Sequence, residues 1–186
     1  MSRLSNLPQL VAYQKTLIAG GTPEPVMPHI SGTTIAFNNA NPDTITDSGS
    51  NFIKKGFQPE MTVTVTGATN SANNNTFTVD TVVAGTLTLS TDAVLTAESA
   101  GATVTIQCVY PVPDGIEIVL KAKDANAGII YYANSSAKAD KNSGSPGNGF
   151  NNTLKNNESI KLQMDNLSRL WYDGTTGEGI EVCFEA

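Results

Sequence analysis

Strict alternation of apolar and polar residues runs through the middle of the chain. Residues 61–66 read Met-Thr-Val-Thr-Val-Thr, and similar alternation returns at 76–79, 86–89 and 102–106. Neighbouring side chains of a strand point to opposite faces of a sheet, so each run predicts a strand with one buried and one wet face. Gly and Asn turns separate the runs, and this spacing indicates a small sandwich or barrel.

The remainder of the chain is also predicted to be strands and loops. Apolar or alternating segments predict five further strands, at 116–121, 129–132, 159–164, 170–172 and 180–184. Residues 134–153 hold little to bury and are expected to form an exposed loop. At most one or two helical turns are expected, at residues 93–100. The predicted fold class is therefore all-β.

The composition agrees with this reading. Charged residues make up 15% of the chain, well below the roughly 25% of an average globular protein. The polar surface must come from neutral residues, and the chain has 22 Thr, 18 Asn and 16 Gly. Thr favours strands, whereas Asn and Gly favour the turns between them.

Charge and hydropathy exclude several classes of function. The net charge is -6 and no basic run is present, so binding to nucleic acid is not expected. No apolar run reaches the roughly 18 residues of a membrane span, and the first residues lack the layout of a signal peptide. We expect assembly in the cytoplasm. Cys108 and Cys183 are then expected to be reduced thiols.

An ordered series of short motifs occupies residues 113–180. In chain order these are Pro113-Asp114-Gly115, Gly128-Ile129-Ile130-Tyr131, Gly149-Phe150, Asn157-Glu158-Ser159-Ile160-Lys161-Leu162, Leu170-Trp171-Tyr172-Asp173-Gly174 and Gly177-Glu178-Gly179-Ile180. The series resembles a small β-sandwich module of tailed-phage structural proteins. Asn157 stands where that module usually has Gly, and residues 138–148 are an insertion, so this turn and this loop depart from the pattern.

A second series lies within residues 35–106. It contains Asn41-Pro42-Asp43-Thr44-Ile45-Thr46-Asp47, then Gly56-Phe57-Gln58-Pro59 and the alternating strands. This series is similar to a β module of phage tail, fibre and other virion proteins. Together the two likenesses imply a structural protein of the phage particle.

The order of the two series implies that one domain is inserted into the other. The expected fold has two small β-sandwich or barrel domains, one inserted into a loop of the other, and an extended N-terminal arm. The arm is residues 1–10, the base domain is 11–28 plus 110–186, and the inserted domain is 29–109. Proline-rich segments flank both junctions, as expected for stiff connections. Two sequential domains are the alternative.

Residues suited to catalysis are few. His29 is the single histidine and has no nucleophile motif near it, so a surface or hinge position is expected and zinc is not. Asp43 and Asp47 could hold calcium, but their spacing matches no EF-hand, and a turn network is the expected role. A glycosidase needs two carboxylates across a cleft, and the sequence places no such pair. We expect no enzyme activity, cofactor or metal.

Binding to other proteins is the expected activity. Six residues are candidate partner contacts, chosen from their position and predicted exposure: Leu4, Leu7, Leu10, Tyr13, Tyr132 and Trp171. In each aromatic pair, 131–132 and 171–172, one ring should be buried and one exposed. An exposed ring fits a protein interface better than a glycan platform, although glycan binding stays open.

The resemblance implies a place in the virion. The leading hypothesis is a capsid decoration (cement) protein, a homotrimer that binds the major capsid protein and copies of itself on the outside of the head. The second is a tail or head–tail component, such as a fibre or baseplate adaptor, whose inserted domain faces the host. The third is a carbohydrate-binding module, and contact with a host-surface glycan is possible in all three.

Overall fold

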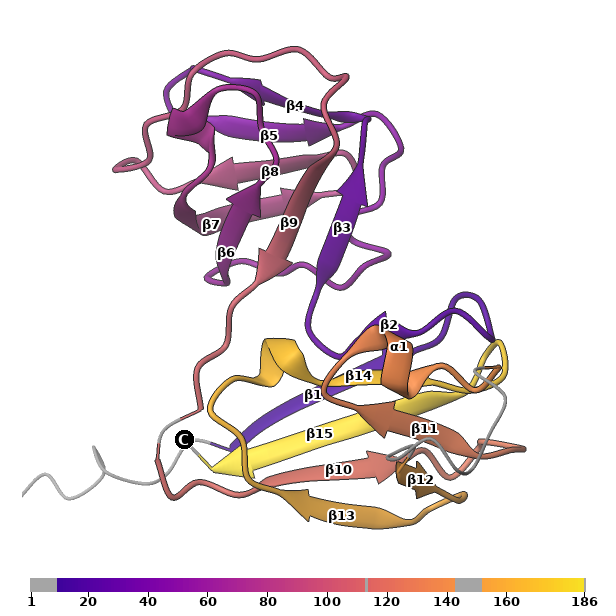
Figure 1. Cartoon of the computed structure of the whole chain (residues 1–186). Helices are drawn as coiled ribbons and strands as arrows, with labels where there is room; N and C mark the ends of the chain where they lie inside the picture. The colour runs from indigo at the N-terminus through magenta and orange to yellow at the C-terminus, as the bar shows by residue number, and fades with distance from the viewer. Residues whose placement is uncertain (1–9, 113, 143–151, 186) are drawn as a thin grey trace, which may run out of the picture. The chain divides into compact units, whose positions relative to one another are not determined.

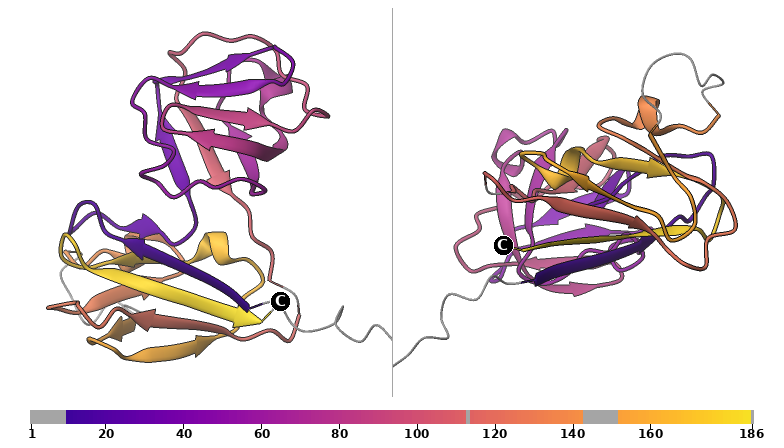
Figure 2. Two further views of the ribbon diagram at one scale, coloured as in Figure 1. Left: turned by 180° about the vertical axis from the view of Figure 1, so that it is seen from behind. Right: turned by 90° about the horizontal axis from the view of Figure 1, so that it is seen from below.

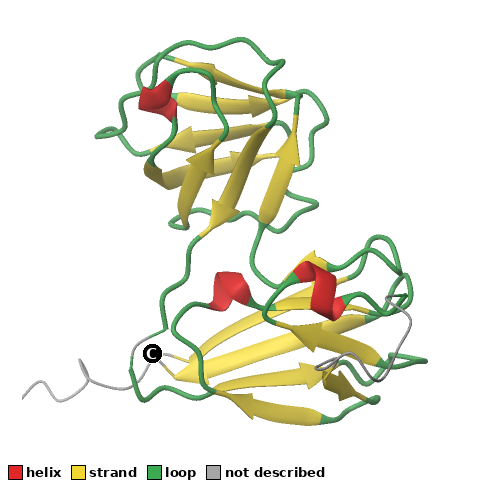
Figure 3. Cartoon of the chain, in the orientation of Figure 1, coloured by secondary structure: helices red, strands yellow, loops and turns green. Residues whose placement is uncertain are grey.

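The structure is a computed structural model that describes residues 10–112, 114–142 and 152–185. It is nearly all β, as expected, and Figure 3 shows strands throughout. The helices of the described residues are one short α-helix, α1 (Ser136–Ala139), and two 3₁₀ turns, η1 (Ser71–Asn73) and η2 (Leu167–Arg169). The chain divides into two compact units. Unit 1 is Met1–Val26 with Pro111–Ala186, and unit 2 is Met27–Tyr110.

Unit 1 has β-sandwich character and contains two four-stranded sheets. The first has the order β1 (Leu10–Thr16), β15 (Gly179–Glu185), β10 (Ile118–Ala122) and β13 (Ser159–Leu162). Every neighbouring pair in this sheet is antiparallel. Figure 1 shows the strands side by side, and the left view of Figure 2 shows β1 and β15 from behind. The sheet ends at β1 on one side and at β13 on the other.

The second sheet of unit 1 is made of shorter strands. Its order is β12 (Asn152–Leu154), β11 (Ile130–Ala133), β14 (Trp171–Asp173) and β2 (Glu24–Pro25). The core lies between the two sheets, and along β10 buried residues alternate with half-buried ones, as a strand with one face in the core requires. Its fully buried members include Ile118, Leu120, Ile130, Tyr172, Ile180 and Val182.

A buried ion pair crosses this core. Lys15 comes from β1 in the first sheet and Glu24 from β2 in the second, and the two side chains are 7% and 8% exposed. Lys15 Nζ lies 3.4 Å from Glu24 Oε2 and donates a hydrogen bond to the carbonyl of Pro25. It also lies 6.0 Å from the ring centroid of Tyr172. The pair therefore joins the two sheets where an apolar contact would be usual.

Unit 2 is one seven-stranded antiparallel sheet. Its order is β3 (His29–Gly32), β9 (Val104–Cys108), β6 (Thr62–Thr66), β7 (Thr76–Val83), β8 (Thr86–Leu89), β5 (Thr44–Asp47) and β4 (Ile35–Asn38). The register shifts within β7 between Val79 and Thr81. A bulge bends a strand and increases its twist. Figure 1 accordingly shows β4, β5 and β8 running across the direction of β3, β9 and β6.

The bend lets this sheet enclose its own core. Most apolar positions of the alternating strands turn inward, although Val83 at the end of β7 is exposed. Phe52 and Phe57 pack edge to face in this core, with ring centroids 5.5 Å apart. The outward positions of the same strands are mostly threonine, and Thr64 and Thr76 share a hydrogen bond between their hydroxyls across β6 and β7. The predicted separation into one buried and one wet face is thus observed in β6 and β9.

One expectation about local structure is wrong. Residues 93–100 form no helix, because their backbone groups bind distant partners instead. Leu95 N donates to the Asp43 carboxylate, Thr96 exchanges two hydrogen bonds with the Asn73 side chain, and Glu98 pairs with Phe37 as an isolated bridge. These tertiary contacts replace the hydrogen bonds that a helix would have made.

The segment 134–153, which was expected to be one long loop, includes regular structure. It contains α1, and β12 begins at Asn152. Residues 143–151 lie outside the described part of the chain.

Candidate functional site

A pocket of about 560 Å³ opens in unit 1. Its lining comes from the end of β11, from α1, from the first residue of β12, and from the stretch between the last residue of β13 and Leu170. Apolar side chains of Tyr132, Leu162, Met164 and Leu170 meet the polar side chains of Asn134, Lys138, Asn152, Gln163, Asp165 and Arg169 there. The volume lies in the range of small-ligand sites, and the mixture of groups suits a ligand with one apolar and one polar part.

The pocket exists because the sandwich is incomplete at its β13 edge. Ile160 and Leu162 lie opposite Leu120 and Ile118 in the sheet, and residues that are directly opposite share a face. Leu120 and Ile118 are fully buried, yet Ile160 is 36% exposed and Leu162 is half-buried. The core-facing side of the last strand is therefore only partly covered.

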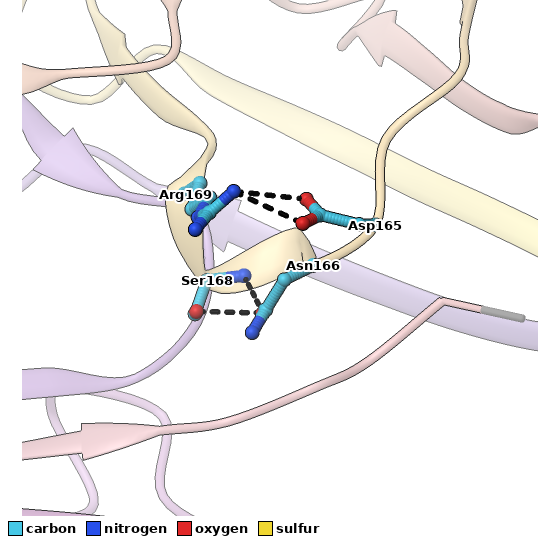
Figure 4. Close-up of polar contacts among 4 residues, drawn as sticks. All are labelled: Asp165, Asn166, Ser168 and Arg169. Atoms are coloured by element: carbon cyan, nitrogen blue, oxygen red, sulfur yellow. Dashed lines mark hydrogen bonds and ion pairs between the residues drawn. The ribbon is translucent and has the colours of Figure 1, made fainter.

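Figure 4 shows the 3₁₀ turn that carries the pocket's arginine. The side-chain oxygen of Asn166 accepts hydrogen bonds from the Ser168 backbone N–H, at 2.9 Å, and from the Ser168 hydroxyl, at 2.6 Å. This cap fixes the start of η2. One turn later, Arg169 Nη1 contacts both carboxylate oxygens of Asp165, at 3.2 and 3.0 Å. The turn thus holds one nitrogen of the guanidinium group in place.

The two buried carboxylates near the Asp-Gly and Gly-Glu-Gly turns have structural roles. Asp173 is fully buried and accepts hydrogen bonds from the backbone N–H groups of Gly21, Gly174 and Lys141. Glu178 accepts from the backbone N–H groups of Gly128 and Thr175. These bonds tie together loops that are far apart in the sequence. They explain why acidic residues occur at these motif positions.

Asp43 and Asp47 accept hydrogen bonds in the turn networks that the sequence predicts for them. The two oxygens of Asp43 accept from the N–H groups of Ala40 and Leu95. Those of Asp47 accept from the Thr34 hydroxyl, from Gly49 N–H and from two nitrogens of Asn51. Burial raises the pKa of the Asp47 carboxyl, but these hydrogen bonds outweigh burial, and the pKa lies below its ordinary value.

The remaining candidate for catalysis, the single histidine, lies in unit 2. His29 is the first residue of β3, opposite Gln107, and is half-buried. Within residues 10–112, 114–142 and 152–185, no group of three or more His, Cys, Asp or Glu side chains is arranged to hold a metal ion. No helix in these ranges is long and apolar enough to cross a membrane.

Cys108 should be unreactive in the native protein. It is 1% exposed on β9, and burial raises the pKa of its thiol to about 12. Because the thiolate is the reacting species, a Cys183→Ser variant should leave Ellman's reagent unreacted at pH 8 until urea unfolds the protein. The Cys108→Ser variant is the control and reports the half-buried Cys183 thiol alone. Rapid native reaction of Cys183→Ser would contradict the burial of Cys108.

Four of the six predicted partner contacts lie within the described residues. Leu4 and Leu7 lie outside the described residues. Leu10 and Tyr13 belong to β1, opposite Glu185 and Val182, and only their backbone is described.

The two aromatic candidates are described with their side chains. Tyr132 is 3% exposed and lines the pocket, whereas Trp171 is half-buried on β14. The Tyr132 ring is therefore a core residue that borders a pocket rather than an exposed ring. A role of these six residues in partner binding stays a prediction.

No sequence pattern indicated the pocket's polar residues. Lys138, Gln163, Asp165 and Arg169 belong to no motif, and Lys138 falls in a segment that was expected to be an exposed loop. The alternation of residues 159–164 did indicate a strand. That this strand ends a sheet depends on pairing with β10, some 40 residues earlier in the chain. Comparison with models of protein families, with curated proteins and with solved structures finds no match.

Proposed function

We propose that this chain is a structural protein of a tailed-phage particle, and specifically a capsid decoration protein that binds the outer surface of the head. The observation that carries the proposal is the ordered likeness of residues 113–180 and 35–106 to modules of phage virion proteins. The nearly all-β structure is compatible with both modules. The function is binding, with no chemical step.

The roles of the motif residues support this proposal. Asp173 and Glu178 are the two buried acidic residues of the motif series, and each accepts a hydrogen bond from a backbone N–H group of a distant loop. Acidic residues used in this way shape a binding scaffold and leave no free catalytic pair at these positions. The low charge content also suits a surface that is covered by neighbours in an assembly.

The sheet edges provide a physical mode of assembly. β1 and β13 each have a hydrogen-bonded neighbour on one side only in the described sheet. An unpaired edge can accept a strand from another chain, which adds backbone hydrogen bonds. In the proposed arrangement, the N-terminal residues that precede β1 lie along a neighbouring subunit. Many symmetry-related contacts then bind more tightly together than each would alone.

The domain layout is part of the proposal. Unit 1 acts as the base that binds the major capsid protein, and unit 2 is a domain inserted into a loop of that base. Copies of the chain form a homotrimer that bridges capsid subunits. Unit 2 is available to contact the host surface, including its glycans, and assembly takes place in the host cytoplasm before the virion is released.

A tail or head–tail component is the second candidate. The likeness of residues 35–106 extends to tail and fibre proteins, and this observation favours the alternative. A carbohydrate-binding module is the third, and the amide side chains of Asn134, Asn152 and Gln163 in the pocket favour it. Glycan arrays probed with the purified chain distinguish the third candidate from the first two.

Gold-labelled antibodies against the chain test the proposed location. On purified particles viewed by negative-stain electron microscopy, we expect label distributed over the whole head. Label confined to the tail or to one vertex would contradict decoration and support the second candidate. Antibodies against the major capsid protein provide the matched control for head labelling.

A further inference from the structure

The edge at β13 is incomplete in a specific way. Ile160 and Leu162 face the core side of the sheet, yet the sheet ends with their strand, and no further strand of the described chain pairs beyond it. In the facing sheet the edge strand β12 has only three residues, of which Asn152 and Thr153 are exposed. Apolar surface and unpaired backbone groups therefore occur on the same strand.

The pocket continues this edge into the interior. Leu162, the last residue of β13, and Met164, two residues later, both line the pocket. Tyr132 and Leu170 supply further apolar lining. An extended segment that lay beside β13 would point every second side chain toward the core. An apolar side chain at one of these positions would fill the pocket and cover Leu162.

The charged side chains of the pocket indicate which kind of polypeptide segment would bind there. Lys138 and Arg169 contribute two positive charges and Asp165 one negative charge, so the lining is positive in a chain of net charge -6. Both oxygens of Asp165 engage a single nitrogen of Arg169, and its other guanidinium nitrogens bond to none of the described residues. The Lys138 ammonium also has no ion-pair partner among them. Free donors of a guanidinium group match a carboxylate.

We propose that the β13 edge and this pocket form the docking site for an extended, acidic segment of a partner protein. The segment adds a fifth strand beside β13, places an apolar side chain in the pocket, and sets a carboxylate against Lys138 and Arg169. This inference rests on the proposed function, because it names the surface through which the base binds its protein neighbour. The unpaired strand edge favours a polypeptide over an acidic glycan, since a glycan has no backbone to continue the sheet.

The test is a selection from a displayed library of random twelve-residue peptides on the immobilised full chain. We expect enriched peptides to alternate apolar and polar residues and to carry Asp or Glu. A synthetic peptide of the enriched sequence should bind about tenfold more weakly to a Lys138→Ala, Arg169→Ala double variant, which is the effect of losing about 1.4 kcal/mol of binding. The Lys54→Ala, Lys55→Ala double variant removes the same charge in unit 2 and should bind as the wild type does.

Hydrogen exchange distinguishes strand addition from contact through side chains alone. With the peptide bound, backbone amides of residues 159–162 should exchange more slowly, while those of β8 in unit 2 should be unchanged. Unaltered exchange at 159–162, enrichment of peptides without acidic residues, or no enrichment at all would overturn the proposal. So would binding of glucuronate oligosaccharides, but not of peptides, at Lys138 and Arg169.

Failure of this docking proposal can be distinguished from failure of the proposed function. The selection uses the purified chain, whereas the virion role is tested on particles. A chain that is abundant on heads but selects no acidic peptide would retain its virion role and lose only this docking site.

Discussion

Replacing Lys15 by Met is expected to lower the free energy of unfolding by about 3–5 kcal/mol, because the Glu24 carboxylate is left buried without its charged partner. Both side chains are almost fully enclosed between the sheets of unit 1, and their charged atoms are 3.4 Å apart. Glu24→Gln should lower the free energy of unfolding by a comparable amount, because the Lys15 ammonium is then buried without its carboxylate partner. Urea titration followed by fluorescence of Trp171, the single tryptophan, reports unfolding of unit 1.

Two controls define the origin of this effect. Lys121 forms partly exposed ion pairs on the outer face of the same sheet, with Asp124 at 3.1 Å and Glu181 at 3.7 Å, so Lys121→Met should cost far less stability than Lys15→Met. The double variant Lys15→Met, Glu24→Leu should recover most of the stability, because it leaves no buried charge unpaired. A cost below about 1 kcal/mol for Lys15→Met would show that the charges are hydrated rather than enclosed.

Replacing Asp47 by Ala is expected to destabilise unit 2 by about 3 kcal/mol, because four hydrogen bonds to a largely buried carboxylate are lost. The donors come from Thr34, Gly49 and Asn51, so one side chain joins the turn after β3 to the turn after β5. Urea unfolding followed by circular dichroism measures the loss. Asp80→Ala removes an exposed carboxylate from β7 and should change stability by less than about 0.5 kcal/mol.

The lowered pKa of Asp47 also predicts that its contribution to stability depends on pH. Because its pKa is lower in the folded than in the unfolded chain, its contribution is fully present above the unfolded value of about 3.9. The contribution is lost as the pH falls through the folded value. The difference in stability between wild type and Asp47→Ala should therefore be constant near neutral pH and should shrink below about pH 4. A difference that stays constant down to pH 2 would contradict this role.

Strands were the part of the fold that the sequence predicted well. Alternation at residues 86–89 matches β8, and alternation at 61–66 matches β6 to within one residue. These predictions succeed because a half-buried strand repeats every two residues whichever strand lies beside it. The bulge in β7 was not predicted, although the alternation breaks there: the consecutive polar residues Asp80 and Thr81 follow Val79, where the register shifts.

Contacts between distant segments could not be predicted. Lys15 and Glu24 look like ordinary surface residues in the sequence, and only the facing of β1 and β2 makes them a buried pair. The helical turns expected at residues 93–100 failed for the same reason, since Asp43 and Asn73 bind that backbone from far away. The pocket needs the pairing of β13 with β10 before its open edge can be recognised.

The central claim is that the chain decorates a phage head, and its copy number in purified particles tests this most directly. Quantitative mass spectrometry should compare peptides of this chain with peptides of the major capsid protein from the same particles. Decoration predicts on the order of hundreds of copies, near one chain per capsid subunit or one trimer per local symmetry axis. About a dozen copies or fewer would contradict decoration and place the chain in the tail, and absence from particles would contradict a role in the virion.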